Sequence, residues 1–68
     1  MNLLEVIHYI DTKIKNDPND HILWNKIEYD DPQVKDFVFG ILDASMGLSD
    51  MHVLGMLKIL RDTIYFGR

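Results

Sequence analysis

Residues 49–66 read SDMHVLGMLKILRDTIYF, which predicts a long helix with apolar residues on more than one face. One stripe at helical spacing consists of Val53, Met56, Leu57, Leu60 and Ile64. A second apolar set lies outside that stripe and consists of Met51, Leu54, Ile59, Tyr65 and Phe66. A helix that is apolar nearly all round needs burial on nearly all sides, and a chain of 68 residues has little else to cover it. We therefore expect part of this helix to contact another chain.

The chain before this helix carries start and stop signals for further helices. Apolar residues recur three or four positions apart from Leu3 to Ile14, and this first helix should stop before Pro18, because the residue preceding a proline avoids the helical region. The pairs Asp17-Pro18 and Asp31-Pro32 each combine a capping aspartate with a proline suited to the first helical position. They predict a short helix from Pro18 to about Ile27 and a longer one from Pro32 to about Met46. The alternation of Leu23, Ile27 and Tyr29 also fits an extended segment.

The corner before the last helix is predicted from Gly47 and Ser49. Gly47 suits a left-handed cap at the end of the preceding helix, and Ser49 can cap the start of the next one. The expected fold is all-α: a small compact bundle of three to four helices with short connections, forming a single helical domain over residues 1–68. Because so small a core is only just sufficient and there is no cysteine to form disulfides, self-association through the last two helices is also expected.

Composition narrows the class of protein. The chain is 47% hydrophobic and 26% charged, as folded domains are, and the lack of cysteine fits the cytoplasm. No signal peptide and no apolar run of membrane-spanning length is apparent, so a soluble, unprocessed intracellular chain without a membrane partner is predicted. The net charge of -4 disfavours binding to phosphate backbones. The acidic residues of the chain between positions 17 and 36 form either a solvated surface or a docking face for a basic partner.

Residue types that carry chemistry do not converge in the sequence. His8, His21 and His52 belong to three different segments, Asp30-Asp31 fits a capping role before Pro32, and the glycines are isolated. A domain of this size also rarely encloses an active-site pocket by itself. We therefore expect no catalytic residues, no metal site and no cofactor, and we expect that the protein is not an enzyme.

Residues 39–58 resemble a helix-turn-helix in spacing, because Gly47 sits at a corner with apolar residues around it. Asp43 stands where that motif usually has a small residue, and the second helix opens with Asp50, Met51 and His52 instead of base-reading side chains. Lys58, Arg61 and Arg68 would supply few phosphate contacts. A DNA-binding regulator that uses residues 39–58 is therefore the second hypothesis, and nucleic acid is an unfavoured partner.

The favoured hypothesis is a small acidic protein-protein interaction module that modulates or inhibits a larger protein partner. Aromatic and apolar residues outside the core stripes are its best candidate anchors, since such residues dominate the energetics of interfaces. Trp24 is assigned to the core because apolar residues surround it in the sequence. The predicted interface consists of Phe39, Met51, Leu54, Ile59, Tyr65 and Phe66.

Overall fold

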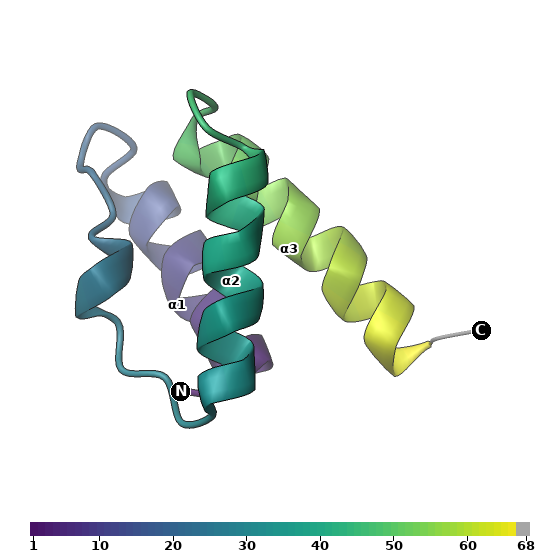
Figure 1. Ribbon diagram of the computed structural model, residues 1–68. Coiled ribbons are helices and arrows are strands. Elements are labelled where there is room, and N and C mark those ends of the chain that lie inside the picture. Colours follow the sequence, from purple (N-terminus) through teal and green to yellow (C-terminus); the bar gives the residue numbers. More distant parts are fainter. Residues whose placement is uncertain (67–68) are drawn as a thin grey trace.

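The computed structural model describes residues 1–66, which form three α-helices and one short 3-10 turn (Figure 1). The α-helices are α1 (Leu3–Asn16), α2 (Pro32–Ala44) and α3 (Asp50–Tyr65), and the 3-10 turn η1 covers Trp24–Lys26. The described part of the chain contains no strand. The prediction of a small all-α bundle is therefore confirmed for these residues.

The helices α1 and α2 start at the same end of the bundle, and α3 runs in the opposite direction, packed against both (Figure 1). Two backbone contacts hold the starts of α1 and α2 together. The Asp30 amide donates to the Met1 carbonyl oxygen at 3.0 Å, and the Met1 amino group donates to the Glu28 carbonyl oxygen at 2.6 Å. Because Asp30 lies just before α2, these bonds place the first turns of the two helices side by side.

The predicted helix from Pro18 to Ile27 is wrong, because only the single turn η1 forms in this segment. Residues 17–31 must travel from the end of α1 back to its start, since α2 begins there. The 14 residues of α1 span about 21 Å at the helical rise, and residues 17–31 cover this distance in the reverse direction. A mostly extended chain covers the distance easily. The alternative prediction of an extended segment is therefore closer to the structure than the predicted helix, although these residues form no strand.

The helix ends follow their predicted signals closely. The Asp31 side chain accepts a hydrogen bond from the Gln33 amide at 2.9 Å, and Pro32 occupies the first turn of α2. The Ser49 side chain caps α3 by accepting from the His52 amide. Helix α2 ends at Ala44 and not at Met46, because the Ser45 amide already bonds to the carbonyl groups of Ile41 and Leu42 in a tightened last turn. Gly47 has a φ of +89°, as expected for a left-handed residue.

The core lies where α3 crosses α1 and α2. Residues 17–31, which we call the returning segment, close one side of it. The returning segment contributes Ile22 and Ile27, with Trp24 and Tyr29 half-buried beside them. The remaining buried apolar residues come from the helices: Val6, Ile7, Ile10, Val38, Ile41, Val53, Leu54 and Leu57. Residues 17–31 therefore supply part of the buried apolar surface, although they form only one helical turn.

Candidate protein-binding site

The six residues predicted to meet a partner fall into three environments. Four of them are exposed on α3 or directly after it, and their exposed fractions are 66% for Met51, 66% for Ile59, 60% for Tyr65 and 79% for Phe66. Phe39 is half-buried, and Leu54 is buried. The structure thus leaves four of the six accessible to another molecule.

Leu54 is removed from the predicted interface, because its side chain belongs to the intramolecular core. Sequence reasoning assigned α3 one narrow buried stripe. Helix α3 instead packs against two helices, so its buried face is wider and reaches Leu54 on the side of α1. Lys58 lies one turn after Leu54 on the same side of α3, and its Nζ atom lies 3.2 Å from the Asp11 carboxylate of α1. This side of α3 therefore faces α1.

Phe39 packs within the chain against the returning segment. Its ring centre lies 6.0 Å from that of Tyr29 in a tilted arrangement, and the Lys35 Nζ atom lies 5.8 Å from the ring centre. Tyr29 is held by its hydroxyl group, which donates to the Trp24 carbonyl oxygen at 3.1 Å. These contacts cover part of the Phe39 ring and leave the side chain half-buried.

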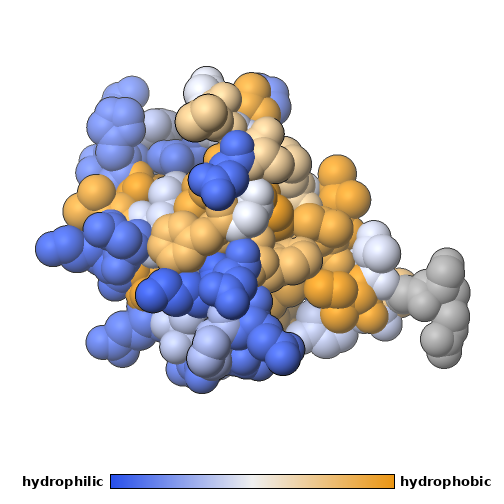
Figure 2. Space-filling model, in the orientation of Figure 1, coloured by the Kyte–Doolittle hydropathy of each residue, from blue (hydrophilic) through white to orange (hydrophobic). Residues whose placement is uncertain are grey.

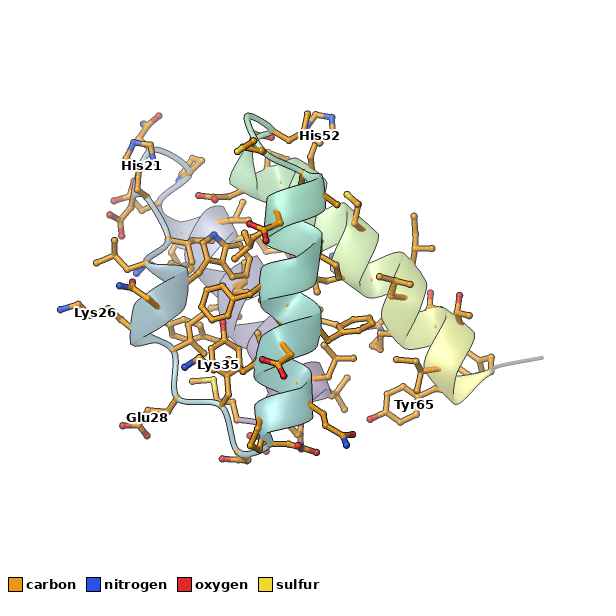
Figure 3. The ribbon with its side chains drawn as sticks, viewed as in Figure 1. His21, Lys26, Glu28, Lys35, His52 and Tyr65 are labelled. Carbon is orange, nitrogen blue, oxygen red and sulfur yellow. The ribbon has the colours of Figure 1, made fainter. Side chains whose placement is uncertain are left out.

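The end of α3 projects beyond the other two helices (Figure 1). Ile64 lies two turns after the fully buried Leu57 and on the same side of α3, yet it is 57% exposed. Tyr65 likewise lies three turns after the buried Leu54 and extends from the projecting end (Figure 3). The core-facing stripe of α3 therefore continues past the point where α1 and α2 can cover it.

A small cleft of about 160 Å³ lies under this projecting end. Helix α1 contributes Leu3 to its wall, helix α2 contributes Val34 and Phe37, and α3 contributes Ile64. Asp31 and Gln33 supply its polar rim. The cleft can accept an apolar side chain from another molecule, because its apolar walls converge from all three helices.

The cleft continues into an apolar surface that covers α3 and the adjoining side of α2, which Figure 2 shows as an orange area. We call this surface the α2/α3 face. From their helical positions and their exposure we assign to it Phe37, Gly40, Ala44, Met56, Ile59, Leu60 and Ile64. The Ser45 hydroxyl group at the end of α2 donates to the Met56 sulfur at 2.9 Å, which fixes the side of α3 that adjoins α2. Asp36 and Asp43 flank Gly40 on the solvent side of α2.

Most residues of this face were missed as interface candidates. Ile64 fitted the core stripe of its helix by spacing, and only the position of α1 and α2 shows that it lies beyond their ends. Gly40 did offer a signal, because glycine destabilises a helix interior and therefore calls for a reason to be there. Within the chain that reason is lacking, since a Cβ atom built at Gly40 would meet nothing within 4 Å.

Two other hollows exist in the described residues. One, of about 270 Å³, lies at the start of α3 and is lined by Asp20, His21 and Asp50 together with apolar side chains. The other, of about 650 Å³, is an open and mostly apolar hollow on the outer side of α1 near His8 and Tyr9. Within residues 1–66, no three histidine or acidic side chains come together as metal ligands, and His21 and His52 emerge from different segments (Figure 3).

The helix-turn-helix candidate corresponds to the second half of α2, the connection 45–49 and the first half of α3. The Asp50 carboxylate accepts a long hydrogen bond from the Ile22 amide at 3.4 Å, so the start of α3 is held against the returning segment. Lys58 is paired with Asp11, and Arg61 is paired with Asp62 at 2.9 Å. Arg68, the third cation considered for phosphate contacts, lies outside the described residues.

None of the described helices is both long enough and apolar enough to cross a membrane. The chain matches no known protein family, no curated protein and no solved structure.

Proposed function

We propose that this protein is a non-enzymatic interaction module that binds a larger protein through its α2/α3 face and so modulates or inhibits that partner. The observation that carries the proposal is the exposure of Ile59 and Ile64 on the α2/α3 face, with Tyr65 and Phe66 also exposed at the adjoining end of α3, in a chain this small. Contiguous apolar surface of this kind is typical of protein contact sites. The proposal includes cytoplasmic localisation and self-association when no partner is bound.

The test is affinity capture from the native cell with the wild-type protein and two variants. Ile59→Asp places a charge at the outer edge of the α2/α3 face, and Ile59 is exposed enough for the fold to tolerate the change. Asn25→Asp places the same charge on the exposed turn η1, away from the α2/α3 face, and serves as the matched control. We expect one specific protein to be retained by the wild type and by Asn25→Asp and to be lost with Ile59→Asp. Equal retention by all three would contradict the proposal.

Self-association is measured separately by light scattering over a wide range of protein concentration. We expect a dimer or higher oligomer for the wild type and a shift toward monomer for Ile59→Asp, because the charged side chain would be desolvated in the contact. A monomeric wild type at every concentration would remove self-association from the proposal and leave partner binding to the capture experiment.

A further inference from the structure

We propose that the partner segment bound by the α2/α3 face is a basic amphipathic helix, which lays its apolar side on this face and pairs its cations with Asp36 and Asp43. The inference rests on the proposed function and names the chemistry of its partner. It is argued from the shape of the face, from the charges along its edge and from the open position at Gly40.

The shape of the face suits a helix. Met56, Leu60 and Ile64 recur every fourth residue along α3, and Phe37, Gly40 and Ala44 line the adjoining side of α2. Two packed helices with apolar rows of this kind form a groove into which the apolar side of a third helix can pack. The cleft beside Phe37 and Ile64 lies at the end of this groove and can take one larger anchoring side chain.

The charges along the edge specify a cationic partner. Asp36 and Asp43 are exposed, and neither carboxylate has an ion-pair partner in the described part of the chain. They lie seven residues apart on α2, which is about 10 Å along one side of the helix. A partner helix with lysine or arginine at positions i and i+7 therefore matches both carboxylates at once. A second copy of this chain is a poorer match, because it brings another net charge of -4.

The position of Gly40 allows close approach. It lies four residues after Asp36 and three before Asp43, so it sits between the two carboxylates on the same side of α2. A Cβ atom at Gly40 would meet nothing within 4 Å, so no intramolecular contact requires glycine there. The missing side chain lets another backbone approach α2 between the acidic groups, which places its cations within reach of both.

The probe is an 18-residue amphipathic peptide of leucine and lysine with two lysines seven residues apart at the edge of its apolar side. A second peptide carries glutamate in place of every lysine and is otherwise identical. Binding to the full chain is measured by calorimetry, and the bound surface is mapped by amide chemical-shift changes. We expect the lysine peptide to bind and to shift amides of α2 and α3, and we expect the glutamate peptide to bind at least tenfold more weakly.

Two variants of the protein test the assignment. Asp36→Asn with Asp43→Asn should weaken binding of the lysine peptide roughly fivefold or more, because two ion pairs are lost. Glu5→Gln with Glu28→Gln removes the same charge from exposed positions elsewhere and should leave the affinity within about twofold. Gly40→Leu should keep the circular dichroism spectrum and thermal stability of the wild type and abolish binding. Asn25→Leu, on the exposed turn η1 away from the α2/α3 face, should leave the fold, the thermal stability and the peptide affinity unchanged.

The outcomes separate this inference from the function on which it rests. Equal binding of both peptides to the α2/α3 face would overturn the basic partner and keep a protein-binding face. Equal weakening by the two double variants would show general attraction to an acidic protein and would also overturn the inference. If neither peptide binds but Ile59→Asp dissociates a wild-type oligomer, the occupant is a second copy. If neither peptide binds and the protein is a monomer that captures nothing, both proposals fail.

Discussion

Tyr29 donates a hydrogen bond to Trp24 within the returning segment, and its ring packs against Phe39 of α2. Burial raises the pKa of its phenol above the ordinary value of about 10. The folded state therefore favours the neutral phenol, whose contribution to stability is complete below the ordinary pKa and is lost as the pH rises past it. Tyr29→Phe should lower the free energy of unfolding by about 1 kcal/mol at pH 7, because the bond to the Trp24 carbonyl disappears.

Urea melts at pH 7 and at about pH 11 check both parts of this prediction. The loss of stability between the two pH values should be smaller for Tyr29→Phe than for the wild type. An unchanged free energy of unfolding at pH 7 would mean that the hydroxyl group contributes nothing to the packing of this segment.

Asp11 connects α1 to α3, since its carboxylate contacts Lys58 at 3.2 Å and Lys15 at 3.3 Å. The hydrogen bond from Lys58 is the main cause that lowers the pKa of this carboxyl group, and Lys15 adds to it while burial opposes it. A lowered pKa stabilises the fold at neutral pH, and the contribution is lost as the pH falls below the ordinary value of about 3.9. Asp11→Asn should therefore reduce the fall in stability between pH 6 and pH 2.

Lys58→Met removes the other member of the pair and should flatten the same part of the pH profile, as measured by denaturant melts at a series of pH values. If Asp11→Asn retains the full acid sensitivity of the wild type, the Asp11–Lys58 contact is too weak in solution to stabilise the fold.

At the scale of the elements, α3 carries a gradient of burial along its length. Leu57 is fully buried and Leu60, one turn later, is only half-buried, so the two leucines are not equivalent core positions as the spacing predicted. Leu57→Ala and Ile41→Ala should each cost about 2 to 5 kcal/mol, and Leu60→Ala should cost less. A chain of this size has a total stability of only roughly 3 to 10 kcal/mol, so the first two variants can unfold it.

Thermal melts followed by circular dichroism check this order, with Lys13→Ala as the control. Lys13 makes a surface ion pair with Asp20 at 3.4 Å and should change the stability by less than about 1 kcal/mol. A larger loss for Leu60→Ala than for Leu57→Ala would contradict the assigned burial.

The elements differ in how well local sequence predicts them. The C-terminal end of α1 and the starts of α2 and α3 follow from capping residues and proline, which act through neighbouring backbone groups. The conformation of segment 17–31 does not follow from local signals. Asp17-Pro18 is a valid start signal for a helix, but whether a helix forms after it depends on where α2 begins. The interface candidates show the same division. Met51 and Ile59 are exposed as their spacing suggested, whereas the burial of Leu54 and the exposure of Ile64 depend on where the other helices lie and end.

At the scale of the whole molecule, charge bears on the rival DNA-binding hypothesis. The net charge is -4, and Lys58 and Arg61 of α3 are each paired with an aspartate. Few cations remain to replace counterions on a duplex, so we expect no retention of random duplex DNA at about 0.15 M salt. Selection from a randomised duplex pool checks this expectation. Recovery of a palindromic site whose binding is lost with His52→Ala would favour the DNA-binding regulator.

The projecting end of α3 has a consequence for the motions of the molecule. Amides in this last turn and a half should open and exchange their hydrogens with solvent much faster than amides near Leu57, because local opening there exposes almost no buried surface. A ligand seated beneath the projection would have to be released before these amides could open. Slower deuterium uptake in residues 61–66 would therefore report occupancy, even for a partner whose contact leaves the average structure unchanged.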